Sequence, residues 1–186
     1  NFGEKGNSRF VTAPDDTPYA CTCATCTALG NTEKNATPAV TELIIRLSQR
    51  FPKHFFFTTS YLTTQQVTDK QLPSNAGVIV SAIDYPLRRT DGKNEQDKKF
   101  ADQLDNWKKV TNNIYIWDYI NNFDDYLTPF PILKIAQQRL QFFKQHGASG
   151  IFFNGSGYSY SSFDEMRTFV LSSLLINPEL PVNDLI

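Results

Sequence analysis

The stretch Gly77-Val78-Ile79-Val80-Ser81-Ala82-Ile83-Asp84 predicts a β-strand that is buried on both faces, because its apolar residues run on with little polar interruption. Similar runs occupy Phe55–Ser60, Ile114–Tyr119 and Gly150–Asn154, and a short extended run covers residues 9–13. Strands buried on both faces are typical of parallel sheets, because helices cover the faces of such sheets. The sequence therefore predicts five parallel strands.

Amphipathic helices are predicted between these strands. Apolar side chains at helical spacing mark four of them: Val40, Leu43, Ile44 and Leu47; Phe100, Leu104 and Trp107; Leu133, Ala136, Leu140 and Phe143; and Met166, Val170 and Leu174. Thr37 before Pro38 predicts the N-cap of the first helix. Gly147 predicts the end of the third, and Ser162 with Glu165 predicts a capping box before the fourth. The alternation of strand and helix indicates the α/β class.

Two architectures fit five strands: the later part, about five βα units, of a (β/α)8 TIM barrel, or an open parallel α/β sheet. A whole barrel takes about 250 residues, and this chain has 186. No repeat, low-complexity tract or linker divides it. We therefore interpret residues 1–186 as a single domain, the C-terminal portion of a TIM-barrel domain whose first strands are missing from this chain.

Polar and aromatic residues follow each predicted strand, and in a barrel the carboxyl ends of all strands open onto one mouth. This pattern favours the barrel over the open sheet. The candidate catalytic carboxylates are Asp15, Asp16, Asp84 and Asp118, and the candidate substrate-binding residues are Tyr61, Tyr85, Trp117, Tyr119 and Asn154. Each candidate also has a structural interpretation: turns or caps for the carboxylates after strands, and core packing for Trp117 and Tyr119.

Several common sites are excluded at this mouth. His54 and His146 each precede a strand, so both are expected at the opposite end of the sheet, where neither can serve a Ser-His-Asp or Cys-His arrangement. The Gly155-Ser-Gly157 turn lacks the first glycine of a nucleophile elbow, because Asn154 stands there. Tyr160 replaces the third glycine of a dinucleotide-binding loop.

Carboxylates, amides and aromatic rings are the groups that carbohydrate chemistry uses. Glycosidic cleavage needs one carboxyl group to protonate the leaving oxygen and a second group to stabilise the oxocarbenium-like transition state. We therefore expect a glycoside hydrolase, with Asp15 or Asp16 as general acid and Asp84 or Asp118 as its partner. A non-catalytic glycan-binding module is the main alternative, and an open-sheet nucleotide-binding protein, with phosphate held near Gly155, is the third.

Charge and hydropathy limit the other partners. The net charge is −1, with Lys and Arg scattered along the chain, which argues against nucleic acid. A membrane-spanning helix needs roughly 20 apolar residues, and no run in this sequence approaches that length. A five-stranded arc leaves two open edges, so we expect either the missing barrel half or a second copy of the chain to cover them.

Three cysteines, Cys21, Cys23 and Cys26, lie within six residues. An odd number cannot pair completely within the chain, and a structural zinc site takes four ligands, of which only three are local. Zinc or another soft metal, one disulfide with one free thiol, and reduced packing thiols all remain open. No cofactor is otherwise expected.

The sequence also resembles a known family. The segments that carry the resemblance are A-P-D-D, C-T-C-A-T-C, F-T-T-S-Y, V-I-V-S-A-I-D-Y-P-L-R-R, I-Y-I-W-D-Y-I-N-N-F-D-D-Y-L-T-P-F-P and G-I-F-F-N-G-S-G. In this order they resemble the bacterial proteins of domain-of-unknown-function family 4838, over nearly the whole chain.

The resemblance implies a barrel similar to those of α-glucuronidases and β-hexosaminidases, in exported proteins of polysaccharide-degrading bacteria. It implies that Asp15 or Asp16 stands where related barrels place an acid, and that Asp118 lines the pocket. Residues 90–98 depart from the family pattern because they contain no cysteine, which removes a fourth metal ligand or a second disulfide.

Overall fold

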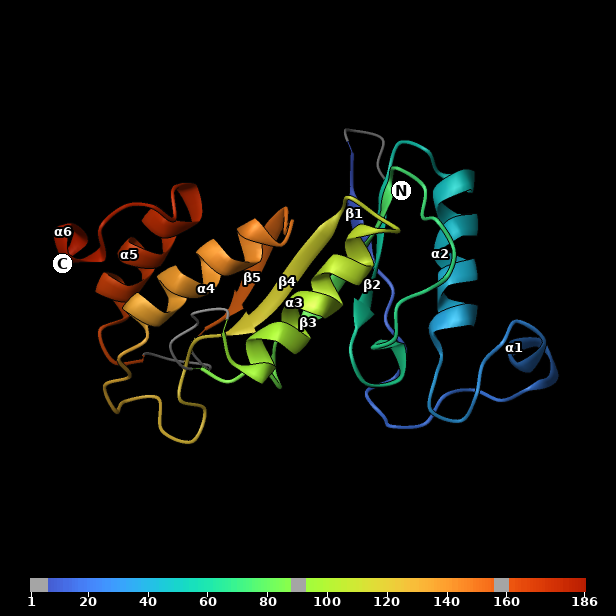
Figure 1. Ribbon diagram of the computed structural model, residues 1–186, viewed down its shortest axis with the longest axis horizontal. Helices are drawn as coiled ribbons and strands as arrows, with labels where there is room; N and C mark the ends of the chain where they lie inside the picture. Colours follow the sequence, from blue (N-terminus) through green and yellow to red (C-terminus); the bar gives the residue numbers. More distant parts are fainter. Residues whose placement is uncertain (1–6, 88–92, 156–160) are drawn as a thin grey trace.

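A computed structural model of the chain describes residues 7–87, 93–155 and 161–186 (Figure 1). Its sheet has five parallel strands in the order β1-β2-β3-β4-β5, so each strand pairs with the next one along the chain. The strands are β1 (Arg9–Val11), β2 (Phe55–Ser60), β3 (Ala76–Ser81), β4 (Ile114–Tyr119) and β5 (Gly150–Asn154). This sequential order is that of a barrel arc, and it confirms the predicted α/β class and the curled part-barrel sheet.

Helices alternate with the strands. They are α1 (Ala24–Ala28), α2 (Thr37–Arg50), the 3-10 turn η1 (Leu62–Thr64), α3 (Glu95–Lys108), α4 (Leu133–Gln145), α5 (Asp164–Ile176) and α6 (Val182–Leu185), and α5 and α6 follow the last strand. Because parallel crossovers are right-handed, successive crossovers in a sequential sheet place their helices on one face. Figure 1 shows α3 and α4 lying across the same side of β3, β4 and β5.

The core lies between this helical layer and one face of the sheet. Phe56 of β2 packs with Ile44 of α2. Val78 and Val80 of β3 belong to a larger cluster that contains Leu104 and Trp107 of α3, together with further side chains from β4 and α4. Alternate residues of each strand therefore point toward the helices, as the pleat of a strand requires.

The remaining strand residues point to the opposite face, which is the inner face of the arc. Phe57 and Tyr115 contact one another there, with ring centroids 5.1 Å apart. Toward the two sheet edges this face is open: Val11 of β1 is 55% exposed and Phe152 of β5 is 56% exposed. The expectation that further barrel strands or a second copy cover this face and the edges stays a prediction.

Two helix starts differ from the sequence-based predictions. The N-cap of α2 is Ala36, and Thr37 is already helical, because its hydroxyl donates instead to the carbonyl of Gln66 at 3.0 Å. The predicted capping box of α5 is wrong: Phe163, with φ of 55°, is the N-cap. The Ser162 hydroxyl donates to the carbonyl of Thr128 at 3.1 Å, so it cannot cap the helix.

The predicted end of α4 is confirmed, because Gly147 follows it with φ of 87°, a conformation that favours glycine. Within the three described ranges, none of the helices is both long and apolar enough to cross a bilayer.

Candidate functional site

The carboxyl ends of the first four strands bring Asp16, Tyr61 and Tyr119 together. Asp16 follows β1, Tyr61 directly follows β2, and Tyr119 is the last residue of β4. The Asp16 carboxylate lies close enough to Tyr61 to raise the pKa of that phenol, and its charge also acts on Tyr119. Ser81, the last residue of β3, lies beside the Tyr119 side chain and acts on its pKa. We call these four residues the rim cluster.

Both phenols of the rim cluster have raised pKa values. Burial raises the pKa of Tyr61 above its ordinary value of 10.0, and Asp16 raises it further through its charge and its hydrogen bond, with smaller effects from Tyr119 and Asp84. Burial also raises the pKa of Tyr119; the hydrogen bond with Ser81 opposes this effect, and the nearby carboxylates add to it. Both phenols are therefore protonated at neutral pH and can donate hydrogen bonds.

Asp84 lies beside the rim cluster, in the loop that follows β3. Its charge acts on Tyr61, and its side chain is exposed. It also lines a small cleft of about 190 Å³. Polar side chains from Gln65 after η1 and from Gln96, Lys99 and Gln103 of α3 contribute to this cleft, together with Phe100. Amide and ammonium groups of this kind hydrogen-bond hydroxyl-rich ligands.

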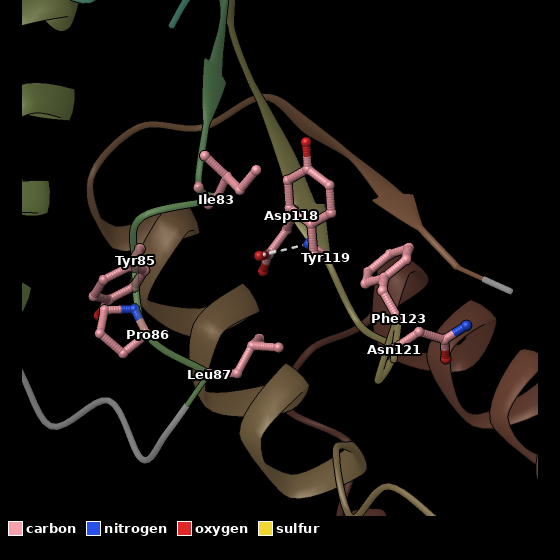
Figure 2. A pocket seen from close by; sticks show the side chains of 9 residues that line it. Ile83, Tyr85, Pro86, Leu87, Asp118, Tyr119, Asn121 and Phe123 are labelled. Atoms are coloured by element: carbon pink, nitrogen blue, oxygen red, sulfur yellow. Dashed lines mark hydrogen bonds between the residues drawn. The ribbon is translucent and has the colours of Figure 1, made fainter. Parts of the chain in front are cut away.

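A larger cavity of about 490 Å³ opens on the other side of Tyr119, between the loops that follow β3 and β4 (Figure 2). Its walls are mostly apolar. They include Ile83 and Leu87 after β3 and Phe123 after β4, and Figure 2 shows the Ile83 side chain pointing toward Tyr119. A volume of this size suits a small-molecule ligand or one unit of a larger one.

Aromatic rings continue the site along the inner face of the sheet. The ring of Trp117 lies near that of Tyr119, with centroids 6.4 Å apart and planes 16° apart, and it meets Phe152 of β5 edge-on at 5.6 Å. The indole Nε1 of Trp117 is buried and has no hydrogen-bond partner within the described part of the chain. A buried donor without a partner costs free energy, so a ligand or further chain whose oxygen accepts from this N–H would bind more tightly.

Asp118 points away from this face. Its side chain is 1% exposed and accepts two hydrogen bonds from Arg139 of α4, at 2.7 Å from Nε and 2.6 Å from Nη2. The same carboxylate accepts from the backbone N–H of Tyr119 at 2.8 Å, the bond drawn in Figure 2. Asp118 therefore points to the helix side of β4, where Arg139 is its partner. It still lines the cavity of about 490 Å³ beside Tyr119, as the family resemblance implied, and its charge contributes to the raised pKa of Tyr119.

Tyr85 also belongs to the core. It is 4% exposed, its hydroxyl donates to Asp97 of α3 at 2.7 Å, and its ring stacks on Phe100 at 4.6 Å. The guanidinium carbon of Arg139 lies 4.3 Å from the centroid of the same ring. The structure thus packs Tyr85 between the sheet and the helices, where Phe100 and Arg139 lie against its ring, although the residue also lines both cavities.

The other predicted residues lie at the edges of the site. Asp15 is exposed beside Asp16. Asn154 ends β5 in register with Tyr119, and its carbonyl accepts from the N–H of Ile120 at 3.2 Å. Gly155 adjoins it, whereas Gly157 and Tyr160, the rest of the glycine turn, lie outside the described residues.

The two histidines lie at the amino ends of the strands, as predicted. His54 directly precedes β2, and its Nδ1 accepts from the backbone N–H of Ser8, which precedes β1, at 3.3 Å. His146 follows α4, with Nδ1 3.1 Å from Asp105 of α3. Both imidazoles are therefore remote from the rim cluster.

Sequence reasoning missed two kinds of residue. Ser81 and Gln103 support the site, but nothing in their immediate sequence distinguishes them from ordinary polar residues. Arg139 had a usable signal: it follows Ala136 by three positions and therefore lies on the buried face of α4. A cation on a core face indicates a buried acidic partner, which here is Asp118.

The fold and the rim together define an α/β part-barrel protein with a polar and aromatic site at the carboxyl ends of its strands. The chain belongs to the family described as "Domain of unknown function (DUF4838)", whose family profile matches residues 4–186. This match confirms the family that the sequence motifs predicted. No curated protein matches the chain.

Proposed function

We propose that the protein is a carbohydrate-active glycoside hydrolase that uses carboxylate acid–base chemistry at the rim cluster. The observation that carries the proposal is that the charge of Asp16 acts on both Tyr61 and Tyr119, while the charge of Asp84 also reaches Tyr61. Two carboxylates and two protonated phenols around one point supply both the acid–base groups and the hydroxyl donors that glycosidic cleavage needs.

The catalytic pair in this proposal is Asp16 and Asp84. One carboxyl group protonates the glycosidic oxygen, and the other stabilises the positive charge that develops on the sugar ring or activates water. Tyr61 holds the Asp16 carboxylate in place by hydrogen bonding. Asp118 is left out of the pair, because its oxygens are occupied by Arg139 and by the backbone of β4.

The rings of Trp117 and Phe152 and the small cleft beside Asp84 form the substrate-binding surface in this proposal. Sugars present apolar C–H faces that pack on aromatic rings and hydroxyl groups that pair with amides. Since polymeric glycans lie outside the cell, we also propose that the protein acts after export.

The test is a screen of aryl glycosides and uronic-acid-containing polysaccharides with the full chain and four variants. Asp16→Asn and Asp84→Asn should each lower turnover by about 100-fold or more, whereas Asp102→Asn, an exposed position on α3, should retain it. Asp15→Asn tells which of the two neighbouring carboxylates acts as the acid. Turnover that survives Asp16→Asn, Asp84→Asn and Asp15→Asn would contradict the proposal.

A non-catalytic glycan-binding module is the second candidate, favoured by the ring surface around Trp117. In that case calorimetric titration would detect oligosaccharide binding, no substrate would turn over, and Asp16→Asn would leave the affinity close to that of the unmodified protein. Trp117→Ala should weaken binding under either candidate.

A further inference from the structure

The loop between β1 and α2 holds a cluster of three thiols that the proposed function does not use. The Sγ atoms of Cys21, Cys23 and Cys26 all lie within 4.8 Å of one another, and all three cysteines are free. Cys23 is the N-cap of α1, and Cys26 lies three positions later on the same side of that helical turn. Cys21 reaches the same point from the preceding loop.

Packing does not explain this cluster. None of the residues of α1 is buried, and both Cys21 and Cys23 are exposed. Cysteine is among the residue types most often found buried, so two exposed thiols that face a third call for a chemical role. An odd number of thiols also leaves at least one outside any disulfide within the cluster.

The backbone around the thiols is held by hydrogen bonds from a buried amide. Asn31 is 6% exposed; its Nδ2 donates to the carbonyl of Cys21 at 3.1 Å, and its Oδ1 accepts from Ala39 of α2 at 3.0 Å. Its backbone N–H donates to the carbonyl of Cys26 at 3.0 Å. The Thr27 hydroxyl donates to the carbonyl of Thr22 at 3.1 Å. The loop therefore presents the three thiols in one fixed arrangement attached to the start of α2.

This arrangement matches the size of a metal–thiolate site. A zinc ion binds sulfur at about 2.3 Å, which places three tetrahedrally arranged sulfurs about 3.8 Å apart. Three sulfurs within 4.8 Å of one another need only small side-chain rotations to reach that spacing. A disulfide requires a sulfur separation of about 2.05 Å and would leave the third thiol without a partner.

We propose that Cys21, Cys23 and Cys26 bind one Zn²⁺ ion, with the fourth coordination position taken by water or an external ligand. The ion would join the loop before α1 to α1 itself and thereby rigidify the connection that carries Asp16. Because thiolates are the ligands, binding releases protons and is pH-dependent.

The experiment is a titration of the full chain, reduced and stripped of metal under nitrogen, first with Co²⁺ as a spectroscopic probe and then with Zn²⁺ as competitor. We expect one ion per chain, with thiolate-to-cobalt charge-transfer absorption that Zn²⁺ displaces. Cys23→Ser and Cys26→Ser should each weaken binding by more than about 100-fold, because even partners outside the ligand shell contribute 10- to 100-fold. Thr25→Ala, which changes the same short helix without removing a thiol, should bind as the unmodified chain does.

Alkylation with iodoacetamide provides a readout that does not depend on spectroscopy. Bound Zn²⁺ should protect all three cysteines in the unmodified chain and in Thr25→Ala. The inference is overturned if the reduced chain keeps three reactive thiols in excess Zn²⁺, if a disulfide forms and persists in excess Zn²⁺ under reducing conditions, if Cu⁺ binds and Zn²⁺ does not, or if the serine variants bind Zn²⁺ unchanged.

Discussion

The ion pair between Asp118 and Arg139 gives the sharpest prediction about the fold. Both side chains are almost fully buried and joined by two hydrogen bonds of 2.7 and 2.6 Å. Removing one partner of such a pair leaves a buried charge without compensation, which costs about 3–5 kcal/mol. A domain of this size has a total stability of about 5–15 kcal/mol, so Arg139→Met removes a large part of it. The corresponding fall in Tm is about 6–20 °C.

The assay is thermal unfolding followed by circular dichroism, with four variants compared at one protein concentration. Arg139→Met and Asp118→Leu should each show the large loss. The double variant should recover much of it, because replacing a whole buried pair by apolar groups is often close to neutral. Asp102→Asn, an exposed change on α3, should leave Tm within about 2 °C.

A structural role for the pair is contradicted if Asp118→Leu unfolds at the same temperature as the unmodified protein while abolishing turnover or glycan binding. That result would return Asp118 to the candidate catalytic set. A double variant no more stable than the two single variants would show instead that the pair is not the source of the loss.

Four further predictions follow from particular contacts. Gly77→Ala would place a Cβ 2.3 Å from the carbonyl oxygen of Asn113, so it should destabilise the protein by about 1–3 kcal/mol in urea unfolding. Gly155→Ala, with open space around it, should leave the stability unchanged. Equal effects of the two substitutions would count against the register of β3 and β4. Trp117→Ala should weaken oligosaccharide binding about tenfold or more by calorimetry, and an unchanged affinity would remove the ring surface from the site. The raised pKa of Tyr61 stabilises the folded state below pH 10.0, and this contribution is lost as the pH rises through the pKa of the folded state. Tyr61→Phe should therefore flatten the decline of the unfolding free energy with pH in alkali. An unchanged pH dependence would argue against a raised pKa of Tyr61. Size-exclusion chromatography should show association or aggregation of the isolated chain, and a well-folded monomer of 21.1 kDa would contradict the expected covering of the sheet edges.

Much of the fold was predictable because continuous apolar runs mark doubly buried strands. All five strands appear within a few residues of the predicted extended or apolar runs, although the edge strands β1 and β5 are not buried on both faces. The helices α1 and α6 were not predicted, because five and four residues are too few to display helical periodicity. The start of α5 was mispredicted because the Ser162 hydroxyl donates its hydrogen bond to the carbonyl of Thr128, which lies 34 positions away and which no local motif reveals.

The site was predictable in outline for a geometric reason. Residues that end neighbouring parallel strands meet at one edge, so Asp16, Tyr61 and Tyr119 come together. The direction of Asp118 was also open to inference, because it alternates with Tyr119 and shares the face of Ile114 and Ile116, both in the core. The hydrogen bond from Tyr85 to Asp97 depends on how α3 docks, which no short-range pattern contains.

The rim cluster is tested most directly by a pH titration of Tyr61 in the full chain. The titration is monitored by NMR of tyrosine labelled with ¹³C at Cζ, and the Tyr61 signal is assigned with Tyr61→Phe. The contact between Asp16 and Tyr61 predicts that Tyr61 deprotonates above the ordinary 10.0 and that Asp16→Asn lowers its pKa. An ordinary Tyr61 pKa that is the same with and without the Asp16 carboxylate would contradict the rim cluster and, with it, the proposed site.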